Sequence, residues 1–211
     1  MPVNVHIHAY RQRRNGHLVD VAEHDRGVPA GGEKPWHDKP HAEIRMHIAD
    51  AERSADKAND GYGEVNPTSG ALGRYQLKLI ALQDIEWKDA DGAWTDRAKM
   101  HGVDSDNAFL TKPAAQEDAM TAYIDRNDEQ LRANGSKTHL GRTYVGPNGK
   151  SFKVTEAGLA AAAHREGARA TKLALDKLKA IAAGNRRAFT KPEGRAIRRM
   201  QTFEDVRYAR S

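Results

Sequence analysis

A glutamate followed by a run of small residues is the part of the chain best suited to chemistry. Glu52 ends a predicted helix, and the sequence SGALGRYQ, residues 69–76, follows after a turn-rich stretch. A carboxyl group donates or accepts a proton during bond cleavage, and partial burial favours its protonated form. Small residues allow a bulky ligand to approach the backbone closely. This pattern predicts a ligand site that contains one acid.

The sequence GALGRYQ, residues 70–76, resembles the motif of a known enzyme family. It matches the Gly-Ala-x-Gly-x-x-Gln motif of lytic transglycosylases of the soluble (Slt) type at every fixed position. In that family a glutamate before the motif is the only catalytic carboxylate. The resemblance covers residues 41–183, and its most specific part is residues 52–76. It implies a lysozyme-like helical domain with Glu52 as the catalytic acid.

The resemblance also implies a substrate and a reaction. Members of the family cleave the β-1,4 bond between N-acetylmuramic acid and N-acetylglucosamine in the glycan strands of bacterial peptidoglycan. Their glutamate protonates the glycosidic oxygen and then takes the proton of the muramic acid 6-hydroxyl, which leaves a 1,6-anhydro end. One carboxyl is sufficient where the substrate's own acetamido group assists the departure. Glu64 is the alternative acid, or a second carboxylate that would make the protein a hydrolase with a reducing-end product.

Substrate-binding residues are implied by the same resemblance. The glutamine of the motif is Gln76, and Ser69 and Gly70 precede it in the segment that we expect to contact the sugar. Tyr75 is expected in the cleft, because a tyrosine ring stacks on a sugar face. Tyr123 is expected in the core with one edge in the cleft.

The sequence LAAAAHREG, residues 159–167, is similar to the closing Ala-Tyr-Asn-Ala-Gly motif of the family. His164 stands in the tyrosine position and Arg165 in the asparagine position. In the family this tyrosine bonds the catalytic carboxyl and the asparagine lies beside the substrate. The two differences leave open a function of another class, in which the same fold is a non-catalytic module that binds the cell wall or nucleic acid.

Helical periodicity predicts how these residues are positioned. Ile44, Ile48, Ala51 and Ala55 form an apolar stripe at helical spacing from about residue 41, and Glu52 lies on its flank. The fold class is therefore mainly α, with a small N-terminal β-hairpin and a short β or loop insertion. We also expect a helix carrying Tyr75, Leu79 and Leu82, and a helix from Pro113 to Asn134 with Met120, Tyr123, Ile124 and Leu131 on its stripe. A loop or hairpin is expected over residues 139–154. It is followed by a helix that Thr155 caps and that runs through His164, and then by a helix with Leu173, Leu178 and Ile181 that ends at Gly184.

Changes in composition predict three regions. Residues 1–40 hold a hairpin that turns at Asn15 and Gly16, followed by a linker rich in glycine and proline. Residues 41–184 form the catalytic domain. Residues 185–211 form a basic tail that either docks on anionic phosphates of the cell envelope or is a solvated helix.

Composition limits the classes of binding partner and the ways in which the protein can reach the cell wall. The 211 residues suffice for one compact domain with short extensions, and a net charge of +5 favours an anionic partner. There is no cysteine for a disulfide or a thiolate site, and no apolar run of the length of a membrane span. The N-terminus lacks the apolar core of a secretion signal. We therefore expect a monomer made in the bacterial cytoplasm that reaches the wall as a bacteriophage lysin or a delivered toxin.

No metal or organic cofactor is expected. The sequence DADG, residues 89–92, resembles part of a calcium loop, but Trp87 and Ala98 would occupy two of its ligand positions, so it is interpreted as a turn. The histidines show no spacing of the HExxH kind, although several of them lie in the hairpin. These are His6, His8, His17 and His24. His37 lies in the linker that follows, and His41 lies at the start of the domain.

Overall fold

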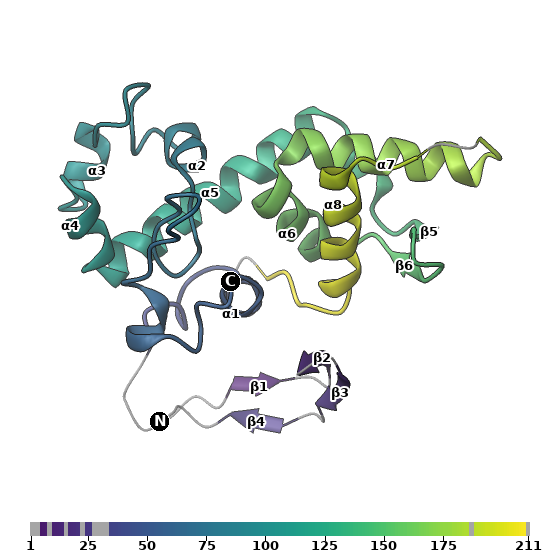
Figure 1. Cartoon of the computed structure of the whole chain (residues 1–211), viewed down its shortest axis with the longest axis horizontal. Coiled ribbons are helices and arrows are strands. Elements are labelled where there is room, and N and C mark those ends of the chain that lie inside the picture. The colour runs from purple at the N-terminus through teal and green to yellow at the C-terminus, as the bar shows by residue number, and fades with distance from the viewer. Residues whose placement is uncertain are drawn as a thin grey trace. The chain divides into compact units, whose positions relative to one another are not determined.

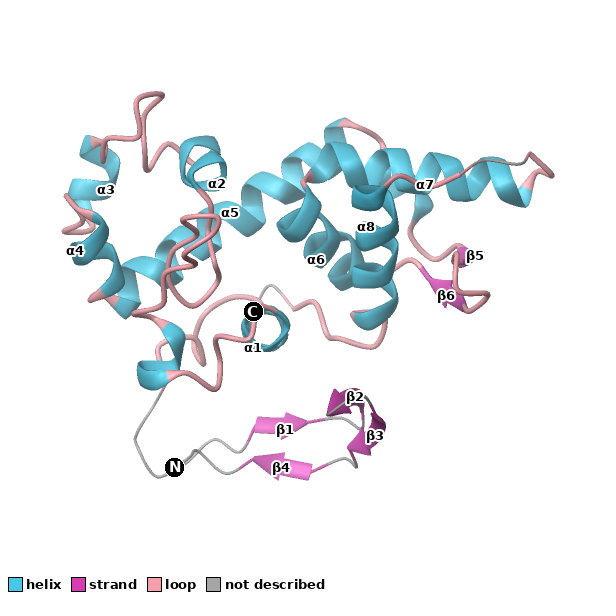
Figure 2. Cartoon of the chain, viewed as in Figure 1, coloured by secondary structure: helices cyan, strands magenta, loops and turns pink. Residues whose placement is uncertain are grey.

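The computed structural model describes residues 5–7, 10–14, 17–21, 24–26, 34–185 and 188–209 of the chain. The chain divides into two compact units, residues 1–37 and residues 38–211. The prediction of a mainly helical protein with short strands is confirmed (Figure 1, Figure 2). In the described residues, no helix is both long enough and apolar enough to cross a membrane.

The first unit consists of two antiparallel strand pairs. β1 (Val5–Ile7) pairs with β4 (His24–Arg26), and β2 (Tyr10–Arg14) pairs with β3 (His17–Val21). In the inner pair Arg14 is opposite His17 and Tyr10 is opposite Val21, an antiparallel pairing that agrees with the strands of the expected hairpin. The turn residues Asn15 and Gly16, and residues 27–33 of the linker, lie outside the described residues.

The second unit is built around its longest helix. That helix, α5 (Pro113–Ala133), contacts α2 and α4 over its first part and α6 and α7 over its second (Figure 1). The other helices of this unit are α1 (Ala42–Ala51), α2 (Leu79–Asp84), α3 (Asp96–Met100), α4 (Asp106–Leu110), α6 (Glu156–Glu166), α7 (Ala168–Ala182) and α8 (Lys191–Thr202), with the hairpin of β5 (Thr143–Val145) and β6 (Ser151–Lys153) before α6.

Most predicted elements of the second unit are confirmed. α5 begins at Pro113 and is followed by Asn134, and β5 pairs with β6 inside the expected 139–154 segment. The Thr155 hydroxyl accepts a hydrogen bond from the backbone N–H of Gly158, at 3.1 Å, and so caps α6 as predicted. α3 and α4 were not predicted, because each is a short helix in a polar stretch that is too brief to show periodicity.

The predicted helix that carries Tyr75, Leu79 and Leu82 starts later than expected, and Tyr75 lies outside it. Helix α2 begins only at Leu79, and Leu72 pairs with Leu77 to form a tight turn. Gly70, Gly73 and Gln76 all have positive φ, at 65°, 70° and 50°. A right-handed helix does not accommodate such residues, so the backbone before Leu79 reverses direction instead.

Residues 185–211, the predicted basic tail, contain a packed helix. Residues 191–202 form α8, which packs on α6 and α7 inside the second compact unit. Its apolar face is completely buried through Ala196, Ile197 and Met200. The helix is amphipathic, and burial of this face outweighs the solvation of its arginines.

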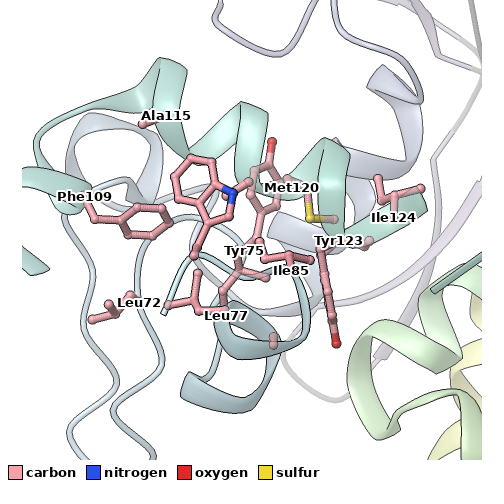
Figure 3. Close-up of a cluster of buried hydrophobic side chains, with 14 of the residues drawn as sticks. Leu72, Tyr75, Leu77, Ile85, Phe109, Ala115, Met120, Tyr123 and Ile124 are labelled. Atoms are coloured by element: carbon pink, nitrogen blue, oxygen red, sulfur yellow. The ribbon is translucent and has the colours of Figure 1, made fainter. Parts of the chain in front are cut away.

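An aromatic and aliphatic core lies between the motif turn and α5. It contains Tyr75, Trp87, Phe109 and Met120, all no more than 1% exposed, and Figure 3 shows Tyr75 beside Met120 and Tyr123. Burial of large apolar side chains is the main source of stability for such a unit. The core therefore fixes the motif turn against α5.

A buried ion pair lies within this core. Arg45 of α1 donates to the Glu117 carboxylate of α5 at 2.7 Å, and both side chains are 0% exposed. The other oxygen of Glu117 accepts hydrogen bonds from the hydroxyls of Tyr62 and Tyr75, at 2.7 and 2.6 Å. Burial and the Glu117 charge raise the pKa of both tyrosines, so both keep the proton that they donate. The network joins α1, the motif turn and α5.

Glu117→Gln is expected to destabilise the protein by about 3–5 kcal/mol, because it leaves the Arg45 charge buried without its counter-charge. The free energy of unfolding in urea measures this loss. Glu129→Gln is the matched control, since that carboxylate is 65% exposed in its pair with Arg126 and is expected to cost less than about 1 kcal/mol. Equal losses in the two variants would contradict a structural role for the buried pair.

Gly73 is required by the side chain that lies against it. A Cβ at this position would overlap the amide of Gln116. That amide accepts from the backbone N–H of Arg74 at 3.0 Å and donates to the carbonyls of Tyr62 and Phe109, both at 2.9 Å. Because the Gln116 side chain holds three backbone groups at once, it cannot move away at low cost.

The stabilities of Gly73→Ala and Gly70→Ala distinguish the cost of this overlap from the cost of backbone strain. Both residues have positive φ, but a Cβ at Gly70 meets nothing within 4 Å. We expect Gly70→Ala to cost about 1–2 kcal/mol from the left-handed backbone alone. Gly73→Ala adds about 1–3 kcal/mol from overpacking. Urea denaturation of the two variants checks the order, and equal costs would show that the Gln116 contact does not matter.

Candidate functional site

One cleft in the second unit collects several of the residues to which the sequence assigns chemistry. Its volume is about 700 Å³, and it lies between the end of α1, the segment leading into α2, the middle of α5 and the junction of α6 with α7. Most of its side chains are polar or charged, which suits a ligand that forms many hydrogen bonds. The lining residues are Glu52, Gln76, Leu77, Lys78, Ile80, Ala81, Gln83, Asp84, Tyr123, Asn127, Gln130, His164, Arg165, Glu166, Gly167, Ala168 and Arg169.

Glu52 lies in this cleft with both carboxylate oxygens paired. It follows the last residue of α1, and its side chain is 8% exposed. Arg165 of α6 donates to one oxygen and Arg199 of α8 to the other, each at 2.7 Å. The partial burial agrees with the expected flank position, and a guanidinium group occupies each of the two carboxylate oxygens. In this arrangement Glu52 is an ion-paired carboxylate.

His164 is a neutral imidazole at the floor of the cleft. Burial, followed by the charges of Arg199, Arg165 and Lys78, lowers its pKa to about 3. Its Nε2 lies 3.1 Å from the Tyr75 carbonyl, so the neutral ring donates from Nε2. His164 therefore does not take over the carboxyl contact that the family's tyrosine makes. Arg165, in the family's asparagine position, makes that contact instead.

Gln76 and Tyr123 complete the group of predicted residues that the cleft brings together. Gln76 donates from Nε2 to the carbonyl of Gly73 at 3.0 Å, which orients its amide. Tyr123 is 8% exposed and packs edge-on against the His164 ring, with 5.7 Å between the ring centres. Tyr123 is thus a core residue that also lines the cleft, as the sequence predicts.

Four other predicted residues lie elsewhere. Ser69 and Gly70 are exposed in the turn before the motif, where the Ser69 N–H donates to Asn66, and neither lines the cleft. Tyr75 is 1% exposed, with its hydroxyl on Glu117, so the prediction of a sugar-stacking role is wrong. Its ring points into the core because the motif is a turn and not a helix. Glu64 is half-buried and does not line the cleft, and its carbonyl accepts from the Gly73 N–H.

Arg199 is the site residue that sequence reasoning missed. It was assigned to a solvated or phosphate-binding tail, yet it bonds Glu52 across 147 positions of sequence. The signal was present, since Thr190 and Glu193 form a capping box and Ala196, Ile197 and Met200 follow at helical spacing. That pattern predicts a packed amphipathic helix with Arg199 beside its apolar face.

The part of the chain that the structure describes contains no candidate metal site. No group of three or more histidine or acidic side chains there could hold an ion. The predicted turn at residues 89–92 is confirmed, since Oδ1 of Asp89 accepts from the backbone N–H groups of Asp91 and Ala93. The side chains of the hairpin histidines lie outside the described residues.

The lowered pKa of His164 predicts how stability depends on pH. The unfolded chain binds a proton at His164 below about pH 6.5, whereas the folded protein binds it only below about pH 3. Between these values the unfolded state holds more protons, so stability falls as the pH is lowered, by at most about 1.4 kcal/mol per unit. We expect His164→Gln to lose less stability than the wild type between pH 6.5 and 4.

Urea denaturation of both proteins at several pH values measures this difference. His47, whose pKa burial also lowers, is present in both proteins and cancels in the comparison. Parallel stability curves for the two proteins would mean that His164 is protonated equally in the folded and unfolded states.

The chain matches no model of a protein family, no curated protein and no solved structure. What can be said of its function therefore follows from the side chains in the cleft and from their geometry.

Proposed function

We propose that this protein cleaves the β-1,4 bond between N-acetylmuramic acid and N-acetylglucosamine in peptidoglycan, as a lytic transglycosylase with a lysozyme-like helical domain. Glu52 is the catalytic acid and base. The protein acts on the wall as a bacteriophage lysin or a delivered toxin, after synthesis in the bacterial cytoplasm.

The observation that carries this proposal is the gathering of four residues along one cleft. Glu52, Gln76, Tyr123 and His164 come from α1, the motif turn, α5 and α6, and the motif likeness had assigned each of them to one site. A cleft of about 700 Å³ has room for several sugar rings, and its mixture of polar and apolar lining residues suits both the hydroxyl groups and the ring faces of a sugar. Tyr123 supplies an aromatic edge, and Gln76 supplies an amide for hydroxyl and acetamido groups.

The chemistry needs one carboxyl group that changes its protonation state. Neutral Glu52 gives its proton to the glycosidic oxygen, and the bond to C1 of the muramic acid breaks with help from the substrate's acetamido group. The Glu52 carboxylate then takes the proton of the 6-hydroxyl, whose oxygen bonds to C1. The products are a free 4-hydroxyl on N-acetylglucosamine and a 1,6-anhydro ring on muramic acid.

The arginine pairs set a condition on this mechanism. A carboxylate held by Arg165 and Arg199 is ready to act as a base, but it must be neutral to act as the acid. Cleavage therefore requires the guanidinium groups to leave Glu52 when the glycan binds. Arg165 is suited to such a movement, because its side chain is 42% exposed.

A hydrolase with two carboxylates has less support. Glu64, the expected second carboxylate, does not line the cleft. Two other acids, Asp84 and Glu166, do line it. Arg195 holds Glu166 through two hydrogen bonds of 2.5 and 2.8 Å, which leaves that carboxylate poorly placed to activate water.

Binding without cleavage is the second candidate function, and the pairing of Glu52 favours it. If the arginines stay on Glu52 when ligand is bound, the acid is absent and the cleft only holds the glycan strand. The basic helix α8 would then add electrostatic attraction to an anionic surface. This function predicts salt-sensitive binding to the wall and no released products.

Mass spectrometry of the muropeptides released from purified peptidoglycan tests the proposal. We expect the wild type to release 1,6-anhydro products and Glu52→Gln to release at least 100-fold less, because the variant has no proton to donate. Glu64→Gln is the matched control and is expected to retain activity.

Each other outcome has a definite meaning. Reducing-end products from the wild type would replace the transglycosylase with a hydrolase. Loss of activity in Glu64→Gln alone would move the acid to that residue. No products from the wild type, with retained binding to the wall, would establish the binding module.

A further inference from the structure

A second, smaller pocket beside the cleft is lined almost entirely by arginines. Its volume is about 240 Å³, and its lining residues are Arg165, Arg195, Arg198, Arg199 and Thr202. The three arginines of α8 lie at spacings of three and four residues, so they share one face of that helix. Arg165 comes from the end of α6 and faces the same pocket.

The positive charge of this pocket is only partly balanced. Arg165 and Arg199 share the Glu52 carboxylate, and Arg195 is paired with Glu166. Arg198 makes no side-chain hydrogen bond or ion pair with any residue that the structure describes. Four guanidinium groups therefore face two carboxylates, and two positive charges remain. Burial is the main cause of the lowered pKa of Arg199; the Glu52 carboxylate opposes this effect and the Arg165 charge adds to it.

Guanidinium groups select the kind of ligand that enters. Their planar donors match the two oxygens of a carboxylate, or those of a phosphate, in a bidentate pair. The Thr202 hydroxyl donates its proton to the Arg198 carbonyl at 2.8 Å, so the donors that remain for a ligand are those of the guanidinium groups. The pocket is thus built for an oxyanion.

Its position relative to the cleft indicates where that oxyanion comes from. Arg165 lines both the cleft and the arginine pocket, so the two spaces adjoin at this side chain. A glycan strand in the cleft carries a peptide stem on each muramic acid, and the stem bears free carboxylates. A stem that leaves the cleft past Arg165 reaches the arginine pocket directly.

We propose that the pocket formed by Arg165, Arg195, Arg198 and Arg199 binds a carboxylate of the peptide stem, so that the protein selects glycan strands that still carry their peptides. This inference rests on the proposed peptidoglycan substrate, but it does not depend on cleavage. It assigns the arginines of α8 to substrate selection and gives a role to the basic helix that packs on α6, beside a cleft for a neutral sugar chain.

Calorimetric titration with two disaccharides tests the inference. The probes are N-acetylglucosaminyl-N-acetylmuramic acid that carries a tetrapeptide, and the same disaccharide with the lactyl carboxyl amidated and no peptide. Neither contains the bond that the protein would cleave, so binding is measured whether or not the protein is an enzyme. We expect the peptide-bearing probe to bind the wild type at least tenfold more tightly.

Variants of α8 and of the segment that follows it locate the contact. Arg198→Gln is expected to reduce the preference for the peptide-bearing probe about tenfold and to leave the affinity for the peptide-free probe unchanged. Arg198→Lys keeps the charge and is expected to lose less. Arg207→Gln is the matched control, because the substitution removes the same charge from an exposed arginine that follows α8 and lies outside the pocket.

The outcomes separate the pocket from the proposed enzyme. Equal affinity of the wild type for the two probes, or an equal loss in Arg198→Gln and Arg207→Gln, overturns the stem-binding site. Tighter binding of a glycerol phosphate oligomer than of the peptide-bearing probe assigns the pocket to a phosphate polymer and also overturns it. Selective binding of the stem without cleavage of glycan strands leaves the pocket in place and removes only the enzymatic proposal.

Discussion

The cleft depends on a buried charge pair that does not belong to it. Arg45 and Glu117 meet with both side chains fully buried, and the hydroxyls of Tyr62 and Tyr75 occupy the second oxygen of the glutamate. A buried carboxylate without these partners would be very costly, so α1 and the motif turn have only one low-energy position on α5. Glu52 lies two turns along the chain from Arg45, and Gln76 directly follows Tyr75. Both cleft residues therefore take their positions from this network.

The protein uses arginine–glutamate pairs in two different ways. In the core the pair is dry and joins elements permanently. At the cleft the Glu52 pairs are close to solvent, and one of the two arginines is substantially exposed. Exchange of partners is far easier there, because water and a bound ligand compensate each charge as it separates. The same type of contact thus holds the fold in one place and leaves room for an exchange of partners in the other.

Much of this architecture was predictable from the sequence, because helix signals are local. Pro113, Thr155 and Gly184 mark ends of helices through their own backbone preferences, and the stripe on α5 follows from the spacing of Met120, Tyr123 and Ile124. The motif turn was mistaken for part of a helix, since the hydrogen bond that holds it at Arg74 comes from Gln116 on a distant helix and leaves no local signal in the sequence. The pairing of Glu52 with Arg199 was missed for the same reason, since long-range partners leave no periodic trace.

The contact between Glu52 and Arg199 can form only after α8 has been synthesised. These residues are separated by 147 positions, and α8 is the last helix of its unit to leave the ribosome. Before that moment Glu52 has no Arg199 and the arginine pocket does not exist, although Glu117 already has its partners Arg45, Tyr62 and Tyr75. The pairing of Glu52 is therefore complete only after α8 has been synthesised, and a chain interrupted before residue 191 holds the cleft residues Gln76 and Tyr123 without Arg199.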